Sequence, residues 1–519
     1  MTVRANPYGQ SAVRSGLLTY LAGRGLSALL TLAVFALAAR VLDLPEYGYY
    51  AATLALMEMG LVLSGGGVDW VAGRLVPEYR VHASGAATGR AVIGFCLMQV
   101  IFLLTAGLAV AAAATPLAAM LHLPEATVAF ELGGALILVE GIGRLSRDQM
   151  LGLLMQQRAA QLAQLMRAGC LALLLGSAWY QGEPLVAGDV LQLELIAASA
   201  SALLGAALLA YTLWRLWPLA QPDAAWQPPL GKDLRRMALQ AYASYFVALT
   251  YGPQVITMLI ARFLGVEAVA IFGFARGFAD QVRRYLPTDL LQSVVRPALM
   301  AFYSTSRDFT GLMLRLGLWL KVALMVLLPL LAFFAGFGEQ AAAALGGARF
   351  GDAWPVLLAL LCCTGLMAWR RVSEQACAAV MAPEICLRAG MLPLLVPPLM
   401  TGMFLLGGGL LTAIALVTAA EAVFCTRVMQ LLRRRGFACH WPYRGYMRLI
   451  AAWGMTTGLL LLLRSQFALP LPAALALTLM LSLLAMAWLN PFDGSEKTLV
   501  GSWSPRLARL FGWRQEETA

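Results

Sequence analysis

Four charged residues stand close together in the middle of an apolar segment of membrane-spanning length, EAVAIFGFARGFADQVRRYLPTDLLQSVVR at positions 267–296. They are Arg276, Asp280, Arg283 and Arg284. A charge near the centre of a bilayer costs about 2.5–3.5 kcal/mol, so such residues usually face a protein interior and serve a substrate or an ion. Three arginines against one aspartate leave excess positive charge, which indicates a site for an anion.

The spacing of these residues places them together. Arg276, Asp280 and Arg283 follow at i, i+4 and i+7, so a helix presents them on one face. An arginine donates two parallel hydrogen bonds to phosphate oxygens, so this face suits a pyrophosphate, with Asp280 holding two of the arginines. The alternative is an internal ion-pair network that only fixes this helix against its neighbours.

Other charges fall inside further apolar segments. Arg24 lies ~10 Å into the first segment and is a second candidate substrate contact, or else it extends its side chain to the membrane surface. Glu58 and Asp69 stand in the second segment, where the triple glycine 65–67 predicts a helix break. With Asp280, these two acids are candidates for binding ions or protons, or for pairing.

The remaining charged residues within apolar segments are expected to pair between helices: Glu131, Glu140, Arg167, Glu194, Lys321 and Glu421. No catalytic residue, metal site or cofactor is predicted, because no CxxC pair occurs and the only Gly-Lys pair lacks the rest of a phosphate-binding loop. The chain is therefore not expected to hydrolyse ATP by that route. Asp69 and Asp280 are candidates to carry protons or ions, as in a secondary transporter, and the membrane potential is an alternative source of energy.

The elements that position these residues follow from composition. Of the 519 residues, 60% are hydrophobic and only 13% are charged, which predicts an all-α polytopic membrane protein. The formal charge of +11 needs no nucleic acid, because the basic residues lie between the apolar segments. Fourteen spans are expected, at 17–39, 48–72, 89–113, 126–146, 160–180, 190–213, 238–261, 267–290, 312–335, 353–372, 388–406, 409–430, 446–464 and 470–489.

The distribution of basic residues predicts the orientation. With the N-terminus in the cytoplasm, only four of the 38 Lys and Arg residues fall in outer loops: Arg40, Arg262, Arg349 and Arg464. Because cytoplasmic loops collect basic residues, both termini are predicted inside, in a multi-pass protein of the plasma membrane.

A repeat divides the chain. The segment Ala39-Arg40-Val41-Leu42-Asp43 is similar to Ala261-Arg262-Phe263-Leu264-Gly265, which lies 222 positions later. At the same offset, positions 49–51 align with positions 271–273. Such an offset predicts two parallel six-helix lobes with a substrate path between them. The expected layout is an N-terminal lobe (1–220), a cytoplasmic linker (221–237), a C-terminal lobe (238–435), an extra transmembrane helix pair (436–490) and a cytoplasmic tail (491–519).

Three stretches carry a family resemblance: ARVLDLPEYGYYA at 39–51 with its second-half echo, Arg74-Leu75-Val76-Pro77-Glu78-Tyr79-Arg80, and Phe350-Gly351-Asp352-Ala353-Trp354-Pro355. Together they resemble the polysaccharide-biosynthesis branch of the multidrug/oligosaccharidyl-lipid/polysaccharide (MOP) exporter superfamily, over about residues 10–435. The resemblance implies a central cavity between two lobes and alternating access.

The same resemblance implies a substrate and a location. The substrate is a polyprenyl-pyrophosphate-linked oligosaccharide, an O-antigen or exopolysaccharide repeat unit, moved from the inner to the outer leaflet of a bacterial inner membrane. Membrane lipids and other polysaccharide assembly proteins are the implied partners. Two alternatives stay open: a lipid II flippase, in which fourteen spans also occur, and a cation-coupled multidrug exporter of the same superfamily. A membrane enzyme is disfavoured because the outer loops are short.

Overall fold

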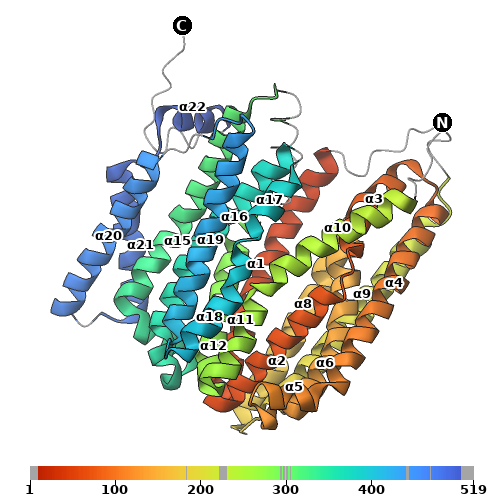
Figure 1. The fold of residues 1–519 in the computed structure, drawn as a ribbon, viewed down its shortest axis with the longest axis horizontal. Coiled ribbons are helices and arrows are strands. Elements are labelled where there is room, and N and C mark those ends of the chain that lie inside the picture. Colours follow the sequence, from red (N-terminus) through yellow and green to blue (C-terminus); the bar gives the residue numbers. More distant parts are fainter. Residues whose placement is uncertain are drawn as a thin grey trace. The chain divides into compact units, whose positions relative to one another are not determined.

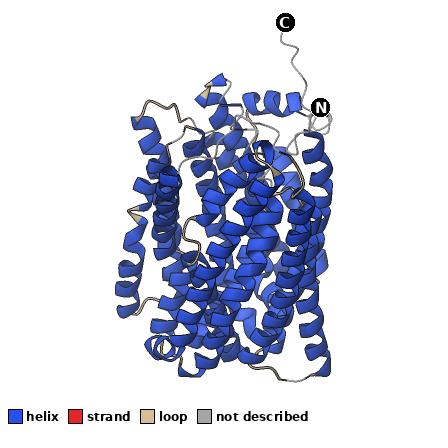
Figure 2. Cartoon of the chain, turned by 90° about the vertical axis from the view of Figure 1, so that its right-hand side faces the viewer, coloured by secondary structure: helices blue, strands red, loops and turns tan. Residues whose placement is uncertain are grey.

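The computed structural model is helical wherever it describes the chain (Figures 1 and 2). It describes residues 10–182, 184–220, 231–290, 306–380, 382–439, 443–467 and 469–503, together with positions 292, 295, 299, 302 and 303. No strand occurs among these residues, which confirms the predicted all-α class. Residues 221–230 of the predicted linker lie outside this description.

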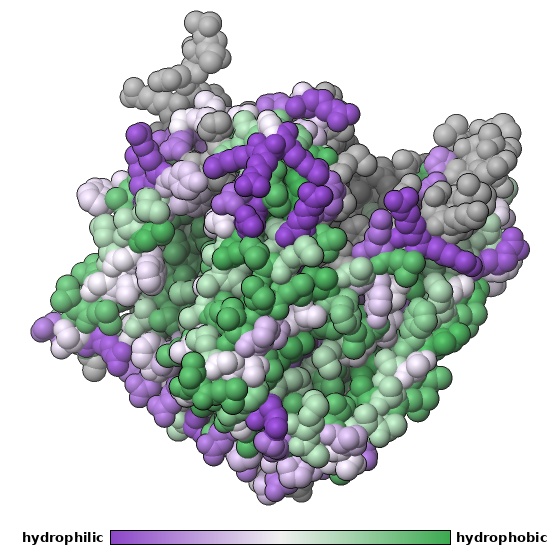
Figure 3. Space-filling model, viewed as in Figure 1, coloured by the Kyte–Doolittle hydropathy of each residue, from purple (hydrophilic) through white to green (hydrophobic). Residues whose placement is uncertain are grey.

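Twelve helical segments of the described chain are long and apolar enough to cross a membrane, and they coincide with twelve of the fourteen predicted spans. The other two predicted spans fall on α2 (Leu44–Leu63) and α12 (Val266–Tyr285). These two helices carry Glu58 and the Asp280 cluster. Figure 3 shows the apolar flanks of the helices, with hydrophilic side chains gathered toward their ends.

Contacts group the chain into two compact units, Met1–Gly273 and Phe274–Ala519, with the boundary inside α12. The first unit contains α1 (Gln10–Val41), α2, α3 (Val68–His82), α4 (Gly85–Ala112), α5 (Ala114–Met120), η1 (Pro124–Ala126), α6 (Thr127–Arg144), the π-helical turn η2 (Leu145–Met150), α7 (Leu151–Leu153), α8 (Gln157–Gln181), α9 (Ala187–Leu216), α10 (Gly231–Thr250), α11 (Pro253–Leu264) and the start of α12.

The second unit contains the rest of α12, then α13 (Pro287–Leu290), α15 (Phe309–Gly346), η3 (Ala348–Ala353), α16 (Trp354–Ala379), α17 (Pro383–Gly390), η4 (Pro393–Leu395), α18 (Val396–Leu405), α19 (Leu410–Arg434), α20 (Tyr443–Gln466), α21 (Leu471–Leu489) and α22 (Gly494–Trp503). Helix α15 is kinked at Phe337, and the guanidinium of Arg464 donates a hydrogen bond of 2.5 Å to the Gly336 carbonyl at that kink.

The start of α2 is set by its sequence. The carboxylate of Asp43 accepts a hydrogen bond of 2.9 Å from the backbone N–H of Glu46, which caps the helix. At the repeat position, Gly265 has φ of +84°, a conformation that glycine adopts easily, and α12 begins at the next residue. Helices α2 and α12 thus begin 222 residues apart, at Leu44 and Val266. This supports the repeat, while the two lobes stay a prediction.

The two repeat-related helices meet within the first unit. A Cβ atom on Gly273 would lie 2.5 Å from the Cβ atom of Ala51, and a Cβ on Gly48 would collide with the carbonyl oxygen of Val266. Ala51 and Gly273 are themselves related by the 222-residue offset. Their contact lies within the first unit, and it requires small residues because the backbones approach closely.

In the second unit, a buried ion pair attaches α22. The ammonium of Lys321 on α15 lies 2.6 Å from the carboxylate of Glu496, and neither side chain is exposed to solvent. The ammonium also donates to the carbonyl oxygen of Pro491 at 2.9 Å. Gly445 of α20 leaves the space for this arrangement, because a Cβ there would collide with both the ammonium and that carbonyl. The predicted pairing of Lys321 is confirmed.

We expect Gly48→Leu to destabilise the first unit, because a larger side chain must displace the backbone of α12. Overpacking of this kind costs about 1–3 kcal/mol. Thermal melting of the detergent-solubilised protein measures the effect. Gly94→Leu on α4 is the matched control, because a Cβ there meets no atom within 4 Å. Equal melting temperatures for the two variants would contradict the close approach.

Candidate functional site

The charged face of α12 forms as its spacing predicts. One carboxylate oxygen of Asp280 lies 3.4 Å from Nε of Arg276, and the other lies 3.2 Å from the guanidinium of Arg283. One acid therefore holds two arginines, one turn above it and one turn below it on the same helix. The three residues together carry a net charge of +1.

Arg283 is the member of this triad best placed to bind an anion. Its side chain is 35% exposed. Besides Asp280, it contacts the thioether sulphur of Met367 on α16 at 3.6 Å and interacts electrostatically with Glu421 on α19. A guanidinium has five N–H donors and a thioether is a weak acceptor, so Arg283 retains donors for phosphate oxygens. Arg284, the next predicted residue, is exposed at the end of the same helix.

Two further arginines near this site were missed by sequence reasoning. Arg371 on α16 lies 3.2 Å from Asp289 of α13 and 3.4 Å from Glu374, and Arg370 contacts Glu374 at 3.0 Å and Glu421 at 2.9 Å. They stand at the predicted cytoplasmic end of a span, where basic residues are expected in any case. Two arginines here share three acids, so this group is an ion-pair network, and the predicted pairing of Glu421 is confirmed.

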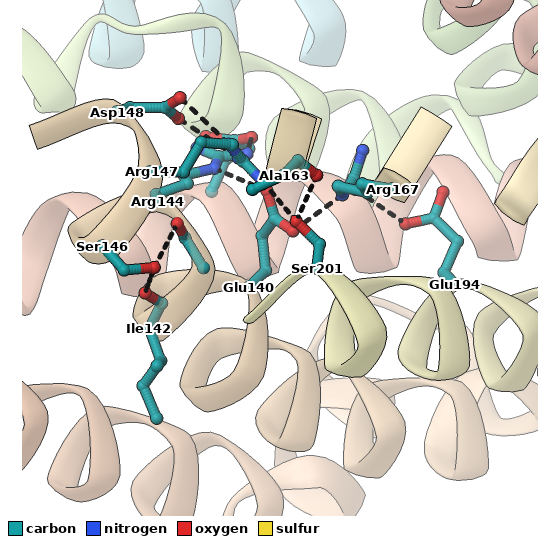
Figure 4. A network of polar contacts seen from close by, with 12 residues as sticks. Glu140, Ile142, Arg144, Ser146, Arg147, Asp148, Ala163, Arg167, Glu194 and Ser201 are labelled. Atoms are coloured by element: carbon teal, nitrogen blue, oxygen red, sulfur yellow. Dashed lines mark hydrogen bonds and ion pairs between the residues drawn. The ribbon is translucent and has the colours of Figure 1, made fainter. Parts of the chain in front are cut away.

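A second network of ion pairs and hydrogen bonds lies in the first unit (Figure 4). The carboxylate of Glu140, which is 2% exposed, contacts three arginines. It lies 3.0 Å from Arg144 on the same helix, 3.4 Å from Arg147 on η2 and 2.8 Å from Arg167 on α8. Such a buried carboxylate is stable only because these partners and their hydrogen bonds surround it.

Each of these arginines has a second acid. The partners are Glu58 for Arg144 at 2.6 Å, Asp148 for Arg147 at 2.9 Å, and Glu194 for Arg167 at 3.4 Å. Glu194 also accepts a hydrogen bond of 2.6 Å from the hydroxyl of Tyr50. Four acids thus surround three arginines, so this network, unlike the α12 triad, has no excess positive charge. The predicted pairing of Glu140, Arg167 and Glu194 is confirmed, whereas Glu131 is exposed.

The repeat relates the acids of the two networks but not their arginines. Glu58 of α2 and Asp280 of α12 are 222 residues apart, at equivalent places on equivalent helices. The positions equivalent to Arg276 and Arg283 are Leu54 and Leu61. Glu58 therefore reaches across to Arg144 of another helix, whereas Asp280 finds its partners on its own helix. The positive face belongs to the second repeat alone.

The two remaining predicted residues lie in the first unit. Arg24 is partly buried on α1, and its approach to the α12 face stays a prediction. Asp69 stands in the first turn of α3, beyond the end of α2, so the predicted single span 48–72 is two helices. Its carboxylate accepts a hydrogen bond of 2.8 Å from the amide of Gln149. Within the described chain, no cluster of His, Cys, Asp and Glu could hold a metal ion.

Comparison with known proteins decides the family. Residues 13–302, more than half of the sequence, match the family described as polysaccharide biosynthesis protein. The chain belongs to this family. No curated protein sequence matches it. The described helices and the family match agree with the resemblance drawn from residues 39–51 and 74–80.

The fold of this polysaccharide biosynthesis protein is similar to the folds of two solved membrane transport proteins. It is similar to the structure of the lipid II flippase MurJ in an inward closed conformation, with a TM-score of 0.65, 11% identity, and coverage of 91% of this chain and 98% of that one. It is also similar to an inward-facing MATE family multidrug resistance transporter of the MOP superfamily. There the TM-score is 0.56 and the identity 17%, over 79% of this chain and 94% of the other.

We expect Glu140→Gln to destabilise the first unit strongly. Three buried or partly buried arginines would lose the charge they share, and breaking a buried ion pair costs about 3–5 kcal/mol. The melting temperature of the purified protein reports the loss. Glu131→Gln on the same helix is the control, since an exposed substitution changes stability by no more than about 0.5 kcal/mol. If both variants melt at the same temperature as the parent protein, the network does not stabilise the first unit.

Proposed function

We propose that this chain is a flippase that moves a polyprenyl-pyrophosphate-linked oligosaccharide, an O-antigen or exopolysaccharide repeat unit, from the inner to the outer leaflet of the bacterial inner membrane by alternating access. Both termini then face the cytoplasm. The family, the membrane-spanning helices and the fold shared with two transporters support this class. None of these features requires a catalytic residue or a cofactor.

One observation carries the choice of substrate. The face of α12 presents Arg276 and Arg283 with a single acid between them, and Arg283 is partly exposed. A pyrophosphate is a compact anion that accepts parallel hydrogen bonds from guanidinium groups. In this proposal Arg283 and Arg284 receive it near the cytoplasmic end of α12, and Arg276 lies further along its path. Arg24 is a further candidate contact for the substrate.

The two alternatives predict different features. A cation-coupled exporter of cationic drugs needs an acidic or aromatic cavity, which the arginines of α12 disfavour. A lipid II flippase would use the same pyrophosphate chemistry, and the fold is similar to one such protein. The family match to polysaccharide biosynthesis proteins favours a repeat unit over lipid II. Gene deletion in the native host separates them, because loss of lipid II transport stops peptidoglycan synthesis whereas loss of repeat-unit transport removes surface polysaccharide only.

We expect Arg276→Ala and Arg283→Ala each to abolish export of the glycan without loss of protein from the membrane. Hydrogen bonds to a charged group contribute about 1.5–3 kcal/mol each, so losing one guanidinium weakens pyrophosphate binding by roughly tenfold to a hundredfold. Surface polysaccharide and the accumulated lipid-linked precursor are measured in a deletion strain that carries each variant. Arg283→Lys retains the positive charge but loses the planar guanidinium that donates two parallel hydrogen bonds, so partial export is expected.

Arg427→Ala provides the matched control, because Arg427 is an exposed arginine on α19 that contacts only Gln430 among the described residues. A charge exchange, Arg276→Asp with Asp280→Arg, tests the alternative role. If the exchanged protein exports normally, the triad only fixes α12 in place. Full export by both alanine variants would rule out the anion site.

A further inference from the structure

The loop between α20 and α21 borders a cavity in the second unit, at the end of this helix pair opposite to α22 (Figure 1). Its volume is about 400 Å³, within the range of roughly 300–1,000 Å³ that is typical of small-molecule sites. Phe467 in its wall is 61% exposed, so the cavity opens to the exterior. The side chains that line it are those of Phe337, Gln340, Arg464, Phe467, Leu469 and Pro470.

The kink of α15 holds an arginine in the wall of this cavity. The backbone of Phe337 is not helical, and the guanidinium of Arg464 on α20 donates a hydrogen bond of 2.5 Å to the carbonyl oxygen of Gly336 there. The same guanidinium lies 5.9 Å from the centre of the Phe337 ring. The bond to the kink uses one of the five N–H donors of a guanidinium. Stabilisation of the kink therefore leaves donors of Arg464 available to the cavity.

The charge of Arg464 is not balanced by an acid. Among the residues that the structure describes, Arg464 forms no ion pair, and no acid lines the cavity. Glu339 lies next to Gln340 in the sequence but turns toward η3, because its Cγ lies 3.8 Å from the position that a Cβ of Gly351 would take. Gln340 itself adds a neutral amide with two further donors. The cavity thus combines one positive charge and hydrogen-bond donors with aromatic and aliphatic walls.

The cavity lies where lipid headgroups are expected. Helix α20 has 24 residues, and at 1.5 Å per residue it is ~36 Å long, slightly more than the ~30 Å of the hydrocarbon layer. Arg464 stands close to the end of this helix at Gln466, so it reaches the headgroup level. Both helices also expose leucines along their length, as lipid-facing helices do: Leu459, Leu461, Leu462, Leu475, Leu479 and Leu483. A ligand of this cavity therefore has acyl chains for neighbours.

We propose that this cavity binds the phosphate headgroup of an anionic phospholipid. The guanidinium of Arg464 donates parallel hydrogen bonds to phosphate oxygens, and the amide of Gln340 adds another. One unbalanced positive charge matches the single negative charge of such a lipid, and it does not favour a zwitterionic choline lipid in the same way. In the orientation proposed above, the lipid belongs to the outer leaflet. Its binding does not depend on the proposed export of a glycan.

Photolabelling of the purified full-length protein in lipid nanodiscs tests this proposal. The probe is phosphatidylglycerol with a photoreactive diazirine near the top of one acyl chain, diluted into phosphatidylcholine, and peptide mass spectrometry locates the label. We expect saturable labelling of peptides that contain Arg464, Phe467 or Leu469. An excess of unlabelled phosphatidylglycerol should remove this label, whereas the same excess of phosphatidylcholine should not.

Arg464→Gln is expected to lower the affinity for the probe by about tenfold, because hydrogen bonds to a charged group are lost. Arg448→Gln is the matched control. Arg448 lies near the other end of α20 and also donates to a backbone carbonyl, that of Asn490 at 2.9 Å, but it does not line the cavity. Labelling beside position 464 should therefore be unchanged. Leu469→Trp fills the cavity but keeps Arg464, so it should also weaken labelling, and it serves if Arg464→Gln does not fold.

Three results would overturn the proposal. The first is equal affinity for the probe in Arg464→Gln, or in a folded Leu469→Trp, and in the parent protein. The second is equal competition by phosphatidylcholine and phosphatidylglycerol. The third is displacement of the probe by a polyprenyl pyrophosphate at lower concentrations than phosphatidylglycerol requires, which would assign the site to that lipid instead. Arg283→Ala should be labelled as the parent is even where it exports no glycan, so this site and the proposed anion site of α12 can fail independently.

Discussion

The carboxylate of Glu140 is the interaction on which the first unit depends. Within a bilayer a charge has no water to stabilise it, so it must find opposite charges in the protein. Glu140 contacts three arginines from α6, η2 and α8, and each arginine contacts a further acid. Four helical elements and α2 are thereby joined through one buried acid. Because removal of Glu140 would take a shared partner from three arginines at once, this network fixes how those helices pack.

The second unit uses charge differently. In the α12 triad, one acid pairs with two arginines of the same helix. Arg283 remains partly exposed beside the thioether sulphur of Met367. A helix does not need such a triad for its own stability, since pairs of this kind contribute only a few tenths of a kcal/mol. Excess positive charge is instead what binding of an anion requires. The arginines occur in the second repeat only, while the acid at the equivalent position occurs in both.

The chemistry of the α12 face differs from that of the break after α2. The face of α12 offers donors on arginines, which suit phosphate oxygens. At the break after α2, the amides of Gln99 and Gln149 donate hydrogen bonds to the carbonyl oxygen of Ser64 and the carboxylate of Asp69. Glycine residues are needed in both places. Gly66 and Gly67 allow the break after α2, and Gly273 allows α12 to approach Ala51 of α2.

The sequence by itself determined the helices, the excess charge on α12 and the pairing of Asp280, because these depend on composition and on spacing along one helix. It also predicted the break at glycines 65–67, since three glycines leave a helix without side-chain support. Only the tertiary structure decided the partners of the other charges. Glu58 with Arg144, Arg371 with Asp289 and Gln149 with Asp69 join residues distant in sequence, and no local pattern identifies which helices meet. The burial of the amide oxygens of Gln99 and Gln149 likewise follows from the packing of helices that are distant in sequence.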